Sequence, residues 1–153
     1  MQQWNTGIMT DSQNTQDRPE ERSITLTRVG EKHYRATNAD GVSIEFGQGE
    51  SLMAPGELFL AALAGCSAVD VDVVTTRRTE PEQFVVEATA NRVTEGDATR
   101  FDDIALKYNL VFPDTKEGNQ ADSLVEKVIQ LSHDKNCTVS RTIEAGSQVK
   151  IRR

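Results

Sequence analysis

Two cysteines, Cys66 and Cys137, are the residues whose chemistry stands out in this sequence. Cys66 lies in the apolar run LAALAGCSAVDVDVV, and Cys137 follows the polar segment LSHDKN. Most buried cysteines are small core residues with inert thiols, which is the simpler interpretation of Cys66 taken alone. Two cysteines on different elements, with none elsewhere, also suit a nucleophile and a resolving partner. Sequence separation does not decide whether they meet, so both interpretations stay open at this point.

The surroundings of the two cysteines predict opposite effects on thiol reactivity. Asp70 follows Cys66 by one helical turn, and a carboxylate there would raise the pKa of the thiol by like-charge repulsion. Cys137 stands at the predicted N-terminus of a short helix over residues 138–144. Free N–H groups and the helix dipole stabilise a thiolate at such a position, which strengthens the case for redox chemistry.

Patterns for other kinds of site are missing from the sequence. His33 and His133 lie far apart along the chain, and neither belongs to a motif with metal-ligand spacing. The GQG triplet at 47–49 is too short for a phosphate-binding loop, and no serine sits in a nucleophile elbow. We therefore expect no metal site and no bound cofactor.

A long helix must carry Cys66. Pro55 suits its first position, Glu57 complements the helix dipole in the first turn, and Pro81 lies beyond its end. Residues 58–74 are apolar nearly all round, and a helix without a polar face is a buried helix. A buried helix of about 25 residues needs more cover than one small chain offers, which predicts an obligate homodimer.

The remaining elements predict an α+β fold. Alternating residues indicate an N-terminal antiparallel β-meander over 24–29, 33–37 and 42–46, and a long β-hairpin over 84–112. A second helix is expected over 121–136, a short third helix over 138–144, and a C-terminal strand over 147–153. Strands and helices are segregated, unlike in a doubly wound sheet. Residues 1–22 are interpreted as a flexible N-terminal tail, which leaves 23–153 as a single domain.

Charge and composition restrict the partners. The chain of 153 residues has 17 Lys and Arg against 24 Asp and Glu, for a net charge of -7. We therefore expect no nucleic acid and no membrane as partner. No apolar run approaches the roughly 20 residues of a spanning helix, and the N-terminus lacks the regions of a signal peptide. Two cysteines are too few for a disulfide scaffold, so a cytoplasmic location is expected.

Two segments resemble a known family. PGELFLAALAGCSAVDVDVV and LSHDKNCTVSRTI are similar to the cysteine motifs of the OsmC/Ohr family (osmotically inducible and organic hydroperoxide resistance proteins), and the first is closest to its YhfA-like branch. The resemblance covers about residues 24–151. It implies an OsmC-like fold in an intertwined homodimer, where each meander joins the partner's sheet and the active site lies at the subunit interface.

The resemblance also implies a mechanism and two departures from it. In peroxidase members the first cysteine, here Cys66, attacks the peroxide and becomes a sulfenic acid. The second, here Cys137, condenses with it to a disulfide, which a dithiol or lipoyl-type reductant restores. An Arg at the first hairpin tip and a Glu directly after the helix-opening Pro form an activating ion pair in those members. This chain has Lys32 at the tip and Gly56 after the Pro.

Activation of Cys66 therefore has to come from other groups, and Glu57, Lys32 and Asp70 are the supporting candidates. Glu57 lies on the opposite side of the helix from Cys66 and roughly 13 Å along it, so it would act only through a basic residue or the partner subunit. We accordingly expect the pKa of Cys66 to lie nearer that of a free thiol than in strong peroxidases, and we expect slow turnover that rises with pH through about 8.

Three functions remain open. The first is a thiol-dependent peroxidase of the peroxiredoxin-like type, acting on organic hydroperoxides in stress defence, with apolar walls that include Phe59, Leu63 and Ile44. The second is a non-enzymatic stress protein of the same fold that binds an apolar or thiol-containing small ligand at the dimer interface. The third is a structural dimer with inert thiols. The paired motifs favour the peroxidase.

Overall fold

The structure is a computed structural model that describes residues 20–153. The predicted tail of residues 1–22 lies almost wholly outside the described residues. The chain divides into two compact units, one up to Glu45 and one over Phe46–Arg153. Both cysteines belong to the second unit. The prediction of one domain over 23–153 stays a prediction.

The N-terminal unit holds the meander. Its sheet order is β1-β2-β3, with the antiparallel strands β1 (Ile24–Gly30), β2 (His33–Asn38) and β3 (Ser43–Gly47), the last of which continues into the second unit. The Asn38 side chain accepts the N–H groups of Asp40 and Val42, and Gly41 adopts the positive φ of 83° that the turn requires. The predicted hairpin chemistry therefore sets the β2–β3 connection.

The two faces of this sheet differ. On one face the carboxylate of Glu45 accepts hydrogen bonds from Arg35 and pairs with His33. The other face carries apolar side chains that remain exposed in the chain, Ile24, Leu26, Val42 and Ile44. Such a face needs a cover that the N-terminal unit does not supply.

Cys66 lies on α1 (Pro55–Thr75). The Glu57 carboxylate accepts the Ala54 N–H at 2.8 Å and so caps the helix start. The helix has 21 residues and is shorter than predicted. It ends where residues 73–76 are all β-branched, because such residues have low helix propensity.

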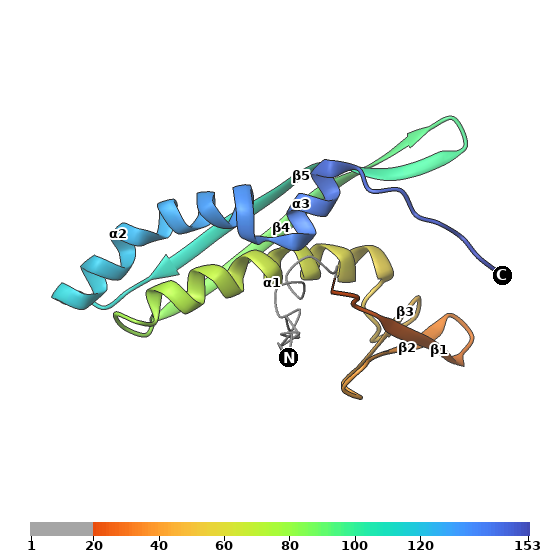
Figure 1. The fold of residues 1–153 in the computed structure, drawn as a ribbon, viewed down its shortest axis with the longest axis horizontal. Helices are drawn as coiled ribbons and strands as arrows, with labels where there is room; N and C mark the ends of the chain where they lie inside the picture. Colours follow the sequence, from red (N-terminus) through yellow and green to blue (C-terminus); the bar gives the residue numbers. More distant parts are fainter. Residues whose placement is uncertain (1–19) are drawn as a thin grey trace, which may run out of the picture. The chain divides into compact units, whose positions relative to one another are not determined.

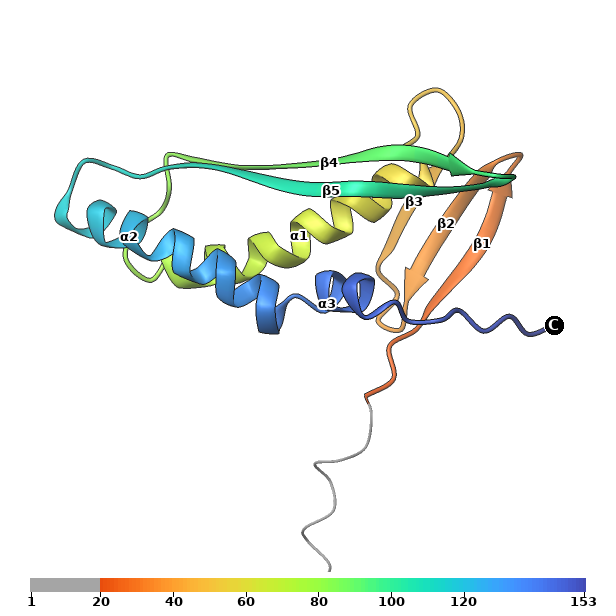
Figure 2. The ribbon, with the colours of Figure 1, turned by 90° about the horizontal axis from the view of Figure 1, so that it is seen from above.

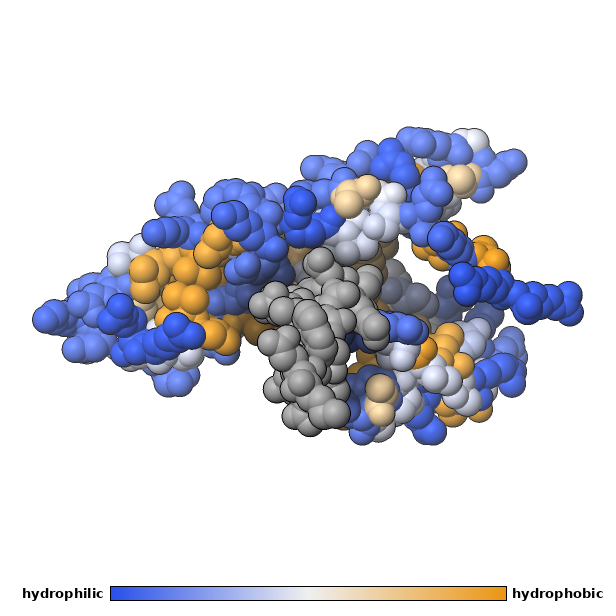
Figure 3. Space-filling model, in the orientation of Figure 1, coloured by the Kyte–Doolittle hydropathy of each residue, from blue (hydrophilic) through white to orange (hydrophobic). Residues whose placement is uncertain are grey.

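Within its own chain α1 is buried along one stripe only. Its buried residues recur every fourth position, at Leu63, Ser67, Val71 and Thr75. Val69 and Val73 are exposed, and Figure 3 shows uncovered apolar side chains over the C-terminal half of α1. A single chain thus leaves much of α1 uncovered, as the sequence argument for a homodimer expects, and burial of the helix in a dimer stays a prediction.

The length of α1 also corrects the expectation that no apolar run approaches a membrane span. By length and composition alone, α1 could cross a membrane. The core helix of a soluble protein has the same two properties, so the finding carries little weight either way.

The rest of the second unit forms two layers (Figures 1 and 2). One is the predicted hairpin of β4 (Gln83–Glu95) and β5 (Ala98–Val111), paired antiparallel. The other contains α1, α2 (Lys116–Leu131), the π-helical turn η1 (Ser132–Asn136) and α3 (Thr138–Ala145). Alternate hairpin residues from Phe84 to Ala90 and from Ile104 to Leu110 are partly buried, as the period of two predicts. The predicted α+β class is confirmed.

Two elements differ from the sequence expectation. α2 begins at Lys116, five residues early, because Thr115 caps it by accepting the Gly118 N–H at 3.1 Å. The predicted C-terminal strand over 147–153 is wrong for the single chain, where Val149 and Ile151 are 88% and 93% exposed. A strand needs a neighbouring strand for its backbone hydrogen bonds, and the described residues offer this segment none.

Candidate redox-active site

The structure brings Cys66 of α1 and Cys137 of the α3 N-terminus together. Cys137 is the N-cap residue of α3, and its sulfur accepts the Ser140 N–H at 3.4 Å. Its side chain also interacts with that of Cys66, which helps to lower the pKa of the Cys66 thiol. Both cysteines are free thiols. Their contact satisfies the geometric condition that sequence separation left open, because the two sulfurs are neighbours.

The N-terminus of α3 is directed at Cys66 as well as at Cys137. Burial acts to raise the pKa of the Cys66 thiol. Hydrogen bonds from the Val139 N–H, from the Cys137 thiol and from Thr138 outweigh that effect and hold the pKa below its ordinary value. Thr138 Oγ1 lies 3.8 Å from Cys66 Sγ. Thus Cys66 has activating partners that the sequence analysis did not identify, because it gave the α3 N-terminus to Cys137 alone.

Cys137 has the opposite character. Burial raises the pKa of its thiol, and the hydrogen bond and the negative charge of Cys66 raise it further, against the lowering effect of the Ser140 N–H. Its side chain is fully buried, whereas Cys66 is partly exposed. The pair is therefore polarised: Cys66 is the more accessible thiol and has the lowered pKa, whereas Cys137 is the buried thiol and has the raised pKa.

The three supporting candidates lie in different surroundings. Asp70 Oδ2 accepts the Ser132 hydroxyl at 2.6 Å, so the carboxylate is engaged at the start of η1. Glu57 is engaged by the backbone of its own helix N-terminus. Lys32 lies at the β1–β2 turn of the N-terminal unit, with a φ of 53°. Their predicted roles in activating Cys66 stay predictions.

Phe101 explains why position 56 is glycine. A Cβ on Gly56 would lie 2.8 Å from Cζ of Phe101, closer than real side chains approach. The Phe101 ring also stacks on Phe59 of α1, with centroids 6.0 Å apart. Phe59 precedes Cys66 by two helical turns and shares its face. An aromatic pair thus occupies the helix start where a carboxylate at position 56 would have to fit.

A cavity of about 290 Å³ lies beside Cys137. His133 lines it, with Nδ1 3.2 Å from the Ser140 hydroxyl and Nε2 3.2 Å from the Glu144 carboxylate. The apolar walls come from α1, β5, α2 and α3, through Leu63, Ile104, Leu106, Ile129 and Ile143. Of the apolar walls predicted from sequence, Leu63 is the one found here. The sequence analysis did not place Ser132, His133 and Ser140 around the cysteines, because their spacing follows no known motif.

Comparisons with known proteins agree on one family. Residues 47–152 match the family model of the OsmC-like protein. A hypothetical protein from Aquifex aeolicus is 22% identical, with a TM-score of 0.66, 86% of this chain and 93% of that chain covered. No curated protein matches this sequence.

Two further solved structures are similar in fold. An OsmC-like protein of unknown function from Vibrio cholerae is 18% identical, with a TM-score of 0.65, 82% of this chain and 95% of that chain covered. The organic hydroperoxide resistance protein of Bacillus subtilis is 16% identical, with a TM-score of 0.51, 80% of this chain and 90% of that chain covered. At these identities the likeness establishes the fold.

Proposed function

This chain belongs to the OsmC-like protein family, and from that premise we propose that it is a cysteine-based peroxidase that reduces organic hydroperoxides in stress defence in the cytoplasm. The observation that carries the proposal is the polarised cysteine pair, in which Cys66 is stabilised as a thiolate by the α3 N-terminus and by Cys137. Thiolates are the nucleophiles that attack peroxides. Solved structures of the same fold include proteins named for organic hydroperoxide resistance, which supports the substrate class.

The reaction proceeds in three balanced steps. The Cys66 thiolate attacks the terminal peroxide oxygen, so that the S–O bond forms, the O–O bond breaks, and the alkoxide leaves and takes up a proton. The Cys137 sulfur then attacks the sulfenic sulfur of Cys66. The S–S bond forms, and the hydroxide leaves as water with the Cys137 proton. A dithiol or lipoyl-type reductant returns two electrons through thiol–disulfide exchange.

We propose that the functional form is a homodimer. Its support is the apolar surface that the chain leaves exposed on α1, at Phe59, Val69 and Val73, and on the meander. A second copy supplies matching apolar surface and a strand edge for residues 147–153. Sedimentation at micromolar concentration should give about twice the 16.9 kDa of the chain. A stable folded monomer would contradict the dimer.

The peroxidase proposal is tested by counting free thiols after addition of cumene hydroperoxide. We expect the loss of two thiols per chain and an intramolecular disulfide between Cys66 and Cys137, identified by mass spectrometry of peptides from unreduced protein. The disulfide should reopen with a dithiol and re-form with fresh peroxide. Unchanged thiols at excess peroxide would overturn the proposal and leave a non-enzymatic member of the family.

A further inference from the structure

A hydrogen-bond network ties the segment before Cys137 to the turn of α1 that carries Cys66. Asp70 Oδ2 accepts the Ser132 hydroxyl at 2.6 Å, and Ser132 Oγ lies 3.3 Å from Ser67 Oγ. Ser67 is hydrogen-bonded in turn to the Tyr108 hydroxyl of β5. Ser67 and Ser132 are 3% and 0% exposed, so the bond between them is shielded from bulk solvent, whereas the bonds to Asp70 and Tyr108 are partly buried.

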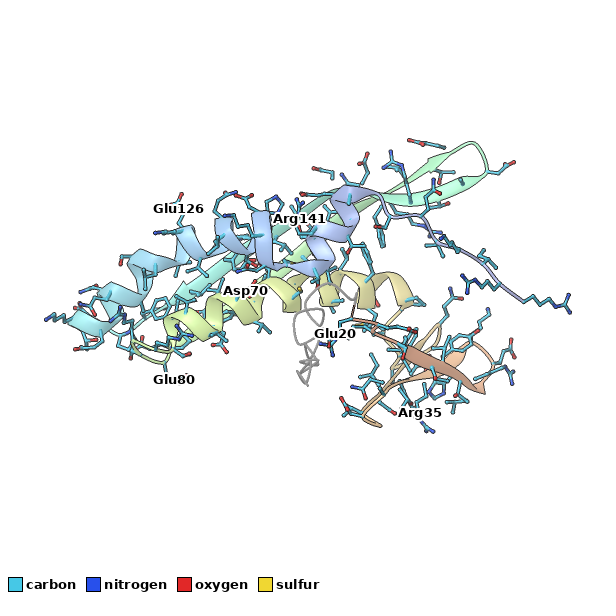
Figure 4. The ribbon with its side chains drawn as sticks, viewed as in Figure 1. Glu20, Arg35, Asp70, Glu80, Glu126 and Arg141 are labelled. Atoms are coloured by element: carbon cyan, nitrogen blue, oxygen red, sulfur yellow. The ribbon has the colours of Figure 1, made fainter. Side chains whose placement is uncertain are left out.

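Asp70 sets the direction of the hydrogen bonds in this network. Each hydroxyl carries a single proton, so a row of three hydroxyls needs a terminal group that only accepts. The Asp70 carboxylate is such a group, and Figure 4 shows Asp70 on the side of α1 that faces the segment between α2 and α3. Without the carboxylate, the buried Ser132 hydroxyl loses its shorter hydrogen bond.

The network continues through the backbone to Cys137. Ser132 is the first residue of η1, and its carbonyl accepts the Cys137 N–H at 2.8 Å. On α1, Ser67 is the neighbour of Cys66 in the chain and Asp70 lies one turn further. Thus one end of the network is attached next to Cys66 and the other end is attached to the backbone of Cys137. The distance between the two cysteines depends on both attachments.

We propose that Asp70 and Ser132 are positioning residues that hold Cys137 in line for its attack on oxidised Cys66. The inference rests on the proposed function, and it concerns the second step of that reaction alone. There the two sulfurs must close to about 2.05 Å. A misplacement of about 1 Å can slow a reaction by about 100-fold. The first step uses N–H donors of α3 itself, at Val139 and Thr138, and depends less on η1.

The experiment separates the two steps in rapid mixing with cumene hydroperoxide. Sulfenic acid is trapped with dimedone, and disulfide closure is followed by quenching with an alkylating reagent. Ser132→Ala and Asp70→Ala should slow closure by about 10- to 100-fold and accumulate sulfenic acid, and Ser132→Ala should leave the first step within about two-fold of the parent. Asp70→Asn keeps one acceptor oxygen and should restore part of the closure rate.

Ser123→Ala is the matched control, because this α2 serine donates only to the Gln120 carbonyl on the exposed side of the helix. It should leave both steps unchanged. Closure in the Asp70 and Ser132 variants as fast as in the parent would overturn the inference. Equal slowing of both steps would do the same, since it would indicate general damage to the fold. Circular dichroism checks folding, and Asp70→Asn replaces any variant that fails to fold.

A second measurement keeps the inference separate from peroxidase activity. In mixtures of reduced and oxidised glutathione, glutathione disulfide is the oxidant, and the equilibrium fraction of the Cys66–Cys137 disulfide reports how well the two thiols are placed. Ser132→Ala should lower the equilibrium constant by about 10-fold. If the parent protein is inert to peroxide but Ser132→Ala still lowers this equilibrium constant, the proposed function is wrong and the positioning role stands. No drop would remove the positioning role.

Discussion

The first turn of α1 and the turn that carries Cys66 lie on the same helix but have opposite surroundings. At the first turn Gly56 is covered by the Phe101 ring, and the carboxylate of Glu57 is engaged in capping the helix. Around Cys66, by contrast, hydroxyl, thiol and N–H groups of η1 and α3 converge on α1. Apolar and capping groups pack against the start of the helix, whereas hydrogen-bond donors contact its middle.

This difference shows that the groups that lower the pKa of Cys66 meet the middle of α1 and not its first turn. A charged group beside the thiol and a helix N-terminus both favour a thiolate. In this chain the donors belong to α3, an element more than 70 positions from Cys66 in the sequence. Loss of a carboxylate at position 56 therefore does not leave the thiol without help. Four substitutions test this interpretation.

The largest effect is expected from Cys66→Ser. It should abolish peroxide-induced oxidation of the chain, because a serine hydroxyl is not ionised at neutral pH and is a weak nucleophile. Intact-mass spectrometry after peroxide treatment measures the outcome. Cys137→Ser is the paired variant and should trap a sulfenic acid or an intermolecular disulfide at Cys66. The reverse pattern would exchange the roles of the two cysteines.

Gly56→Glu should destabilise the protein without raising the rate at which Cys66 is oxidised. The new side chain meets the Phe101 ring, and displacing that ring from Phe59 should cost about 1–3 kcal/mol of unfolding free energy, measured by denaturant titration. The control is the same change in a Phe101→Ala background, where the additional cost should shrink. A stable and faster Gly56→Glu variant would show that the helix start can host an activating carboxylate after all.

Thr138→Val should raise the pKa of the Cys66 thiol modestly. The Thr138 side chain helps to lower the pKa of Cys66, so its loss should move the pH midpoint of Cys66 alkylation upward by a fraction of a unit. At pH 7 the rate should fall a few-fold. In the parent the rate should level off at a lower pH than for an ordinary thiol, because the pKa is lowered.

The matched control for this variant is Thr142→Val, one turn further along α3, whose hydroxyl donates to the Thr138 carbonyl. It should leave the midpoint in place. A parent midpoint at or above that of a free thiol would show that the α3 N-terminus does not activate Cys66, and would return activation to a group outside this unit.

The smallest effect on chemistry is expected from Glu57→Ala. Loss of the bond to the Ala54 N–H should lower the unfolding free energy by about 0.5–1 kcal/mol, with the rate of Cys66 oxidation unchanged. Glu57→Gln serves as control, since glutamine can also complete a capping box. A drop in oxidation rate with stability intact would restore Glu57 as a supporting residue of the thiol.

The sequence by itself located most of the elements and pointed to the two cysteines. Alternation with period two located the meander and the hairpin, and Pro55 with Glu57 marked the start of α1, because these signals act between near neighbours. The motifs around Cys66 and Cys137 were sufficient to identify the family. The predicted helix boundaries were less exact where a capping residue sets them. The Thr115 side chain caps α2, so this helix begins before the apolar pattern from which it was predicted.

Only the tertiary structure decided how the two thiols differ. Which thiol has the lowered pKa depends on where the α3 N-terminus points, and the engagement of Asp70 depends on η1, a turn that no local pattern predicted. Gly56 likewise has its explanation in Phe101, 45 positions away in the sequence. Contacts between distant segments form only when the chain packs, and short-range sequence patterns therefore hold no record of them.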